Sequence, residues 1–117
     1  MSARLITIAE TSLFVRQAQK VWTEAEREEF VNYIAGDPEA GDVIPETGGV
    51  RKIRWSTEGA GKRGGARVIY FYHDAGRPLY LLMVYAKARK EDLSGDEKRT
   101  VRNLAAVLKG KAHDKEK

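Results

Sequence analysis

The sequence VRKIRW at residues 50–55, followed by ARVIYFYH at residues 66–73 and PLYLLMVY at residues 78–85, decides the fold. These segments are rich in β-branched and aromatic residues, which favour β-strands. The residues between the second and third segments, DAGR at 74–77, have the composition of a hairpin turn. We therefore predict three strands that are antiparallel neighbours.

The segment before these strands predicts one more strand and two helices. Residues 4–9 alternate loosely and are β-branched, which predicts a first strand, and residues 11–19 have near-helical apolar spacing. A second helix begins at the capping box formed by Thr23 and Glu26 and ends near Gly36. The following segment, residues 38–49, is rich in Gly, Pro and acidic residues and is predicted to be a loop.

The segment after the strands predicts a C-terminal helix. A second capping box, Ser94 with Glu97, begins this helix, and Gly110 is the predicted stop. The order of elements predicts an α+β fold with a small, antiparallel-rich sheet of about four strands, two N-terminal helices and one C-terminal helix. We assign residues 1–110 to a single domain and residues 111–117 to a polar C-terminal tail.

Composition narrows the class of protein. A chain of 117 residues has the size of one domain, and the absence of cysteine excludes disulfides and thiolate metal sites. The first residues lack the pattern of a signal peptide. The longest apolar stretch, residues 79–86, is too short to span a bilayer. We expect a cytoplasmic protein that does not enter the membrane.

The charge is distributed unevenly along the chain. Residues 51–90 contain ten Lys and Arg against two acidic residues, a net charge of +8, whereas the remaining residues carry a net charge of −4. A basic middle segment indicates a patch that binds a polyanion such as nucleic acid. A solvated basic face is an equally good interpretation of charge alone.

The basic loop at residues 59–64, GAGKRG, formally matches a dinucleotide-binding motif. That motif requires a helix after the loop, whereas the next segment is strand-like, so no nucleotide cofactor is expected. Lys62 and Arg63 are instead candidates for contacting a phosphate backbone, although the loop could equally be a simple long turn. Neither His73 nor His113 has a partner at metal-ligand or catalytic-triad spacing, so no metal site is expected.

Cations and tyrosines are interleaved on the three strands. The period-two rule places Lys52 and Arg54 on one face and Ile53 and Trp55 on the other. Adjacent strands add a further set of such residues: Arg67, Tyr70, Tyr72, Tyr80, Tyr85 and Lys87. Interleaved basic and aromatic side chains are typical of single-stranded RNA binding, but tyrosines also fill ordinary sheets.

Several linked strings resemble the RelE/HigB toxin family. They are GGVRKIRW at 48–55, GKRGGARVIYFY at 61–72, LYLLMVYAK at 79–87 and KEDLS at 90–94. The GKRGG loop and residues 41–49 resemble the HigB branch most closely. The resemblance is specific in sequence over residues 30–93. At the two ends of the chain only the order of the predicted elements is similar.

The resemblance implies the RelE fold and ribosome-dependent cleavage of mRNA without metal or other cofactor. In the family's mechanism the ribose 2′-hydroxyl attacks the neighbouring phosphate. The resemblance also implies neutralisation by a cognate antitoxin, expected to be a small helix-turn-helix protein, and contact with operator DNA only through that antitoxin.

The resemblance also suggests site residues. Lys52 or Tyr85 is assigned to proton transfer, and Arg54, Arg67 and Lys87 to charge stabilisation. RelE carries a tyrosine shortly after the last strand where this chain has Leu93, so either Tyr85, Tyr70 or Tyr72 must substitute or the mechanism is weaker. The expected RNA-binding residues are Arg51, Lys62, Arg63, Tyr70, Tyr72 and Lys90.

Two other functions remain open at this point. A ParE-like inhibitor of DNA gyrase has the same fold without nuclease activity, and a non-catalytic RNA- or ribosome-binding module would show the same basic strands. The cluster of Lys52, Arg54 and Arg67 favours the nuclease, because gyrase inhibition does not require phosphate chemistry.

Overall fold

The computed structural model describes residues 6–56, 65–90 and 92–114 of the chain. Within them, the chain forms three helices and five strands. Their order is β1 (Ile8–Glu10), α1 (Ser12–Val21), α2 (Glu24–Gly36), β2 (Asp42–Val43), β3 (Val50–Trp55), β4 (Ala66–Phe71), β5 (Leu79–Ala86) and α3 (Gly95–Asp114). The predicted α+β class is therefore confirmed, and so are the three long strands.

The strands form one mixed sheet in the order β1-β5-β4-β3-β2. Strands β3, β4 and β5 are antiparallel neighbours, as predicted, and β1 adds to β5 in parallel. The described chain thus has one strand more than the four or so expected. The additional strand, β2, lies in the segment predicted to be a loop, where Asp42 pairs with Lys52 and Val43 with Arg51. Two residues are too few to show the alternation that reveals a strand in a sequence.

Helices α2 and α3 begin at the predicted capping boxes, but α3 does not end where predicted. Thr23 and Glu26 exchange their side-chain and backbone hydrogen bonds at the start of α2, and Ser94 and Glu97 do the same at α3. Helix α3 continues through Gly110 to Asp114, so the predicted stop is wrong. A glycine inside a helix costs about 1 kcal/mol relative to alanine, which weakens a helix without ending it.

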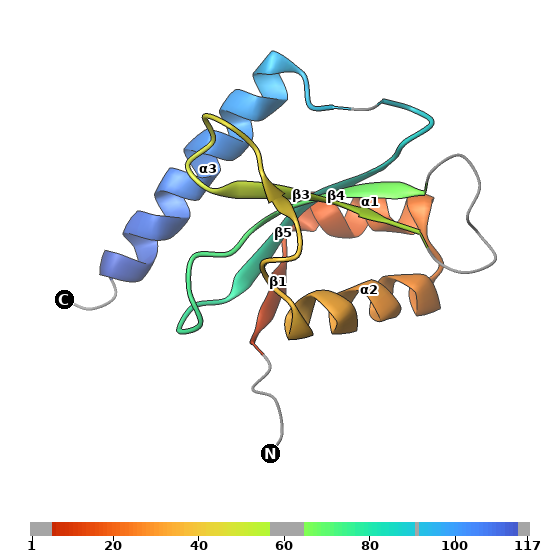
Figure 1. Ribbon diagram of the computed structural model, residues 1–117, viewed down its shortest axis with the longest axis horizontal. Helices are drawn as coiled ribbons and strands as arrows, with labels where there is room; N and C mark the ends of the chain where they lie inside the picture. Colours follow the sequence, from red (N-terminus) through yellow and green to blue (C-terminus); the bar gives the residue numbers. More distant parts are fainter. Residues whose placement is uncertain (1–5, 57–64, 91, 115–117) are drawn as a thin grey trace.

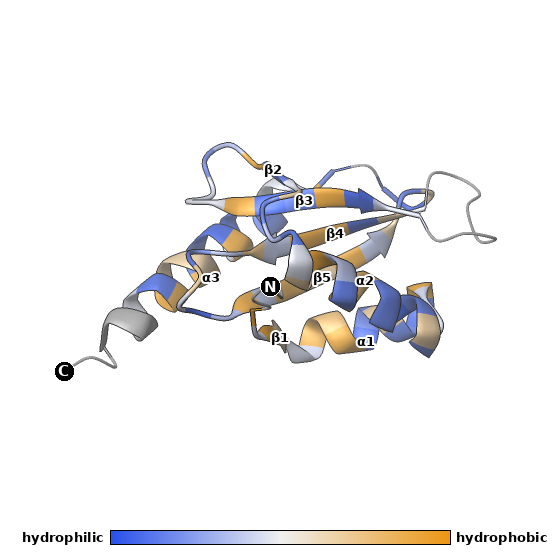
Figure 2. Cartoon of the chain, turned by 60° about the horizontal axis from the view of Figure 1, so that its bottom comes forward, coloured by the Kyte–Doolittle hydropathy of each residue, from blue (hydrophilic) through white to orange (hydrophobic). Residues whose placement is uncertain are grey.

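Helices lie on both faces of the sheet (Figure 1). Helices α1 and α2 cover one face, and their Phe14 and Phe30 belong to a core shared with β4 and β5. Helix α3 packs on the other face through Val101 and Ala105. Figure 2 shows apolar residues concentrated in the central strands β4 and β5, between the two helical layers. Strand β4 is buried along its whole length because it is central in the sheet and has helices on both sides.

A bulge in β5 decides which side chains face α3. The register between β4 and β5 shifts at Ile69 and Tyr70, and the pairing skips Leu82. Leu82 and Met83, although consecutive, both belong to the core on the α3 face. A bulge of this kind reverses the face of every side chain that follows it. Tyr85 consequently points to the α3 face, whereas a regular strand would turn it to the opposite one.

Candidate active site

A row of three side chains crosses the sheet on the face that carries α3. Arg54 of β3 pairs with Arg67 of β4, and Arg67 pairs with Tyr85 of β5. Residues directly opposite on antiparallel strands have Cβ atoms about 4.5–5.5 Å apart. We call these three residues the cationic row. They bring together two guanidinium groups and one phenol, all from the set predicted to be catalytic.

The members of the cationic row differ in exposure. Arg67 is only 3% exposed and Tyr85 only 7%, whereas Arg54 is open to solvent. Arg67 therefore forms the floor of the row and Arg54 its solvent-facing side. Two guanidinium groups that are adjacent in register can donate charge-assisted hydrogen bonds to the same anion. The row is thus suited to bind a phosphate group.

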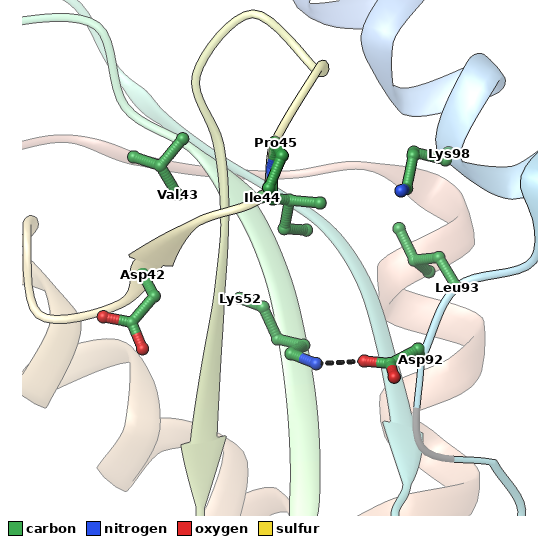
Figure 3. Close-up of a pocket in the computed structure, with 8 residues that line it drawn as sticks. All are labelled: Asp42, Val43, Ile44, Pro45, Lys52, Asp92, Leu93 and Lys98. Carbon is green, nitrogen blue, oxygen red and sulfur yellow. Dashed lines mark hydrogen bonds and ion pairs between the residues drawn. The ribbon is translucent and has the colours of Figure 1, made fainter.

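Lys52 lies on the same face as the cationic row, two residues before Arg54. Its ammonium group forms an ion pair with Asp92, in the segment that leads into α3 (Figure 3). The hydrogen bond from Lys52 and its charge hold the pKa of Asp92 below the usual value, and Arg67 and Lys98 lower it further. Asp92 therefore lies within the electric field of the cationic row.

Lys90 connects the cationic row to the first turn of α3. Its ammonium group lies 4.8 Å from the centre of the Tyr85 ring, a cation–π contact. The same ammonium group donates a hydrogen bond to the Glu97 carboxylate and forms an ion pair with it. This hydrogen bond is the largest cause of the lowered pKa of Glu97. Because Glu97 also caps α3, the orientation of the Tyr85 ring is linked to the start of that helix.

Lys87 is exposed in the turn that follows β5. Its backbone N–H donates to the carbonyl of Gly65 at 3.0 Å, just before β4 begins. Lys87 is thereby anchored at the end of the sheet where the cationic row lies. Lys62 and Arg63 fall outside the described residues.

Comparison with known proteins gives the family. A model of the RelE toxin of the RelE/RelB toxin-antitoxin system matches residues 8–116, nearly the whole chain. The chain belongs to the RelE toxin family. It is therefore a toxin of a toxin-antitoxin system, as the strings in the strands predicted.

A solved structure agrees with this assignment at the level of the fold. The chain is similar to an Escherichia coli RelE toxin in the free state, a double arginine-to-alanine mutant, with a TM-score of 0.54 and 15% sequence identity. The match covers 75% of this chain and 90% of that one. The RelE-like architecture predicted from the sequence is confirmed.

Three residues predicted to bind RNA lie on the opposite face of the sheet. Tyr70 is fully buried, and its hydroxyl accepts from the N–H of Gly41 and donates to the carbonyl of Pro38, both at 2.8 Å. Burial raises the pKa of this phenol. The prediction that Tyr70 stacks on bases is wrong, because no base can reach the ring.

Arg51 and Tyr72 share this opposite face. The guanidinium group of Arg51 donates to the carbonyl of Gly41 at 2.6 Å, and so helps to hold the loop that Tyr70 also holds. Tyr72 is half-buried and packs against the core beneath α1 and α2. The structure therefore separates Arg51, Tyr70 and Tyr72 from the cationic row.

Sequence reasoning missed residues that reach the site from the start of α3. Asp92 forms an ion pair with a lysine forty positions earlier in the chain, and no local pattern indicates a partner so distant. Leu93 and Lys98 lie beside it, around a cleft that also includes Lys52. Only the capping box that begins α3 could have suggested that this segment folds back over the sheet.

Two further observations concern metal ions and membranes. Among the described residues, no three His, Asp or Glu side chains are grouped as metal ligands would be. In the same parts of the chain, every helix is too short or too polar to cross a membrane.

Proposed function

We propose that this RelE-family toxin is an endoribonuclease that cleaves mRNA on the ribosome and thereby inhibits translation. The observation that carries the proposal is the cationic row, in which Arg54, Arg67 and Tyr85 are adjacent across three strands. Transesterification of RNA requires positive charge at the phosphate and groups that move two protons. The row and the neighbouring Lys52 offer both.

In the proposed reaction the ribose 2′-oxygen forms a bond to phosphorus and the bond from phosphorus to the 5′-oxygen breaks. The products are a 2′,3′-cyclic phosphate and a 5′-hydroxyl. Arg54 and Arg67 would stabilise the additional negative charge that develops on the phosphate oxygens. The 2′-hydroxyl must lose a proton and the 5′-oxygen must gain one.

We assign these two proton transfers to Tyr85 and Lys52. Lys52 carries an ammonium group in its ion pair with Asp92, which suits it to donate a proton to the leaving 5′-oxygen. Tyr85, next to Arg67 in register, would then act as a phenolate and accept the proton of the 2′-hydroxyl. This assignment needs no metal ion.

Lys62, Arg63 and Lys87, the last of which the resemblance assigns to charge stabilisation, would bind RNA rather than take part in the reaction. Lys87 is exposed at the same end of the sheet, and Lys62 and Arg63 follow β3 in the sequence. Lys90 is engaged with Tyr85 and Glu97, which favours a role in orienting Tyr85 over direct phosphate contact. Phosphate contacts of this kind provide affinity that falls with salt.

We also propose the partners that this activity entails. A cognate antitoxin, a small helix-turn-helix protein of the kind paired with the HigB branch, would keep the toxin inactive, and operator DNA would be contacted only through it. The site of action would be the cytoplasm, where the ribosomes are.

The test is expression of the chain without a partner, followed by mapping of RNA ends. We expect growth arrest, cuts within translated regions of mRNA, and little cleavage of purified RNA without ribosomes, because the ribosome positions the substrate. Rapid cleavage of naked RNA that requires a metal ion would contradict the proposal. Broken DNA with intact mRNA would indicate inhibition of gyrase instead.

A further inference from the structure

A cleft of about 300 Å³ opens on the α3 face of the sheet, beside the cationic row. One wall is the segment after β2, with Ile44 and Pro45, and the other is the start of α3, with Leu93 and Lys98. Figure 3 shows Ile44 and Leu93 facing each other across the gap, with the ammonium group of Lys98 directed toward it. The ion pair of Lys52 with Asp92 closes one end.

The cleft adjoins the place where we propose that the phosphate binds. Lys52, which lines the cleft, and Arg54 of the cationic row are two residues apart on β3 and share a face. Two residues along a strand span about 7 Å. A phosphate on the row and a group in the cleft would therefore belong to the same nucleotide or to adjacent ones.

The chemistry of the cleft differs from that of the row. Two lysines, Lys52 and Lys98, are balanced by two carboxylates, Asp42 and Asp92. Because its charges are balanced, the cleft suits a neutral group better than an anion. Its aliphatic walls fit a flat apolar surface, and its ammonium and carboxylate groups can donate to and accept from a polar edge. A volume near the lower end of the usual range for ligand sites, about 300–1,000 Å³, admits one ring system.

We propose that this cleft binds one nucleobase of the mRNA next to the cleaved phosphate, and that Lys98 and Asp92 determine which base is preferred. A nucleobase combines the required features: it is flat, neutral and apolar on its faces, and it has donors and acceptors along its edge. A purely aliphatic side chain of a protein partner would form no hydrogen bonds with the polar groups that line the cleft. The link to cleavage rests on the proposed function, whereas binding of a base can be tested separately.

The direct test is a titration of the full-length protein, with its methyl groups labelled for NMR, with each of the four nucleoside 5′-monophosphates. We expect the methyl signals of Ile44 and Leu93 to shift with at least one nucleotide, because a stacked ring changes their magnetic environment. Inorganic phosphate should leave them in place, as it would bind only at the cationic row. Val107, exposed on α3 away from the cleft, is the matched control. If the methyl signals shift with none of the four nucleotides, the proposal is overturned. The cleft would then be a site for a side chain of a protein partner.

The second test concerns base preference. Programmed ribosomes would carry mRNAs that differ in one base beside the cut, and cleavage rates would be compared for the wild type, Lys98→Ala, Leu93→Ala and Val107→Ala. Loss of a charged hydrogen bond should reduce the ratio between the best and worst base by about tenfold in Lys98→Ala. Leu93→Ala should also reduce it, and Val107→Ala should leave it unchanged.

The two tests separate the two proposals. A wild-type protein that cuts no mRNA on ribosomes would refute the proposed function, and the methyl titration would still decide whether the cleft binds a base. Cleavage with unchanged base preference in both cleft variants would overturn the role of the cleft in specificity and leave the nuclease proposal intact.

Discussion

Strands β3 and β4 carry one pair of facing polar side chains on each face of the sheet. One pair is an arginine with a tyrosine, and the other is two arginines. On the α1/α2 face, Arg51 is opposite Tyr70, and on the α3 face Arg54 is opposite Arg67. In the first pair the polar groups are used within the fold: both side chains bond to the backbone of the loop at residues 38–41. In the second pair two positive charges face each other, with Tyr85 alongside.

The difference shows why residue type alone does not identify a site. The Tyr70 hydroxyl and the backbone carbonyl of Lys52 approach Gly41 so closely that a Cβ there would lie 2.9 Å from each of them. The side chains on the α1/α2 face therefore have a structural role, which is to hold the loop against the sheet. The α3 face instead carries two arginines opposite each other, an arrangement suited to binding an anion.

The two tyrosines provide the sharpest way to test this comparison. Tyr85→Phe should lower the rate of mRNA cleavage by about 10²–10⁴-fold if the phenol transfers a proton. Tyr70→Phe should leave cleavage by the folded protein unchanged. It should, however, lower the free energy of unfolding by roughly 1–3 kcal/mol, because the N–H of Gly41 and the carbonyl of Pro38 lose their partner.

Single-turnover cleavage on programmed ribosomes and urea unfolding of each variant would measure the two effects. The comparison of faces fails if Tyr70→Phe reduces cleavage at temperatures where the protein is folded, or if Tyr85→Phe cuts at the wild-type rate.

The arginines test the same contrast with a smaller expected effect. Arg67→Ala should reduce cleavage at least about a hundredfold, since one preorganised charge contact in a transition state contributes roughly 3 kcal/mol. Arg51→Ala should reduce stability by roughly 1.5 kcal/mol through its lost bonds to loop carbonyls, with cleavage preserved.

The measurements are cleavage rates together with circular dichroism and thermal unfolding, which show whether each variant is folded. A folded Arg67→Ala protein that still arrests growth as fast as the wild type would remove Arg67 from the proposed mechanism.

Much of the fold could be predicted from local patterns. The capping boxes located the starts of α2 and α3, and the β-branched segments located β3, β4 and β5. Strand β2 could not be found in this way, because its two residues become a strand only by pairing with β3. The stop at Gly110 was wrong because glycine permits a helix to end without requiring it.

The candidate site was predictable only where strand periodicity is regular. The period-two rule places Lys52 and Arg54 on one face of β3, and the structure agrees. The same rule applied to β5 would put Tyr80 and Tyr85 on opposite faces, but the bulge at Leu82 brings both to the α3 side. A bulge is set by packing between strands and leaves little local signal. Asp92 was missed for a related reason, since its partner Lys52 is adjacent only after folding.

The smallest expected effect concerns the ion pair that joins the α3 face to the segment before α3. Asp92 has a lowered pKa in the folded protein, because Lys52 donates to its carboxylate and attracts its charge. A depressed carboxyl pKa contributes stability above the unfolded value, about 3.9, and that contribution is lost as the pH falls through the folded value. Asp92→Asn should therefore slightly lower the urea midpoint near pH 7, and the difference from the wild type should disappear in acid. Because the side chain is largely exposed, added salt should also reduce the difference.

In a Lys52→Ala background the Asp92→Asn substitution should have less effect, since the main partner is gone. A difference that is equal at pH 7 and pH 3, or undiminished without Lys52, would mean that Asp92 stabilises the segment by some means other than this ion pair.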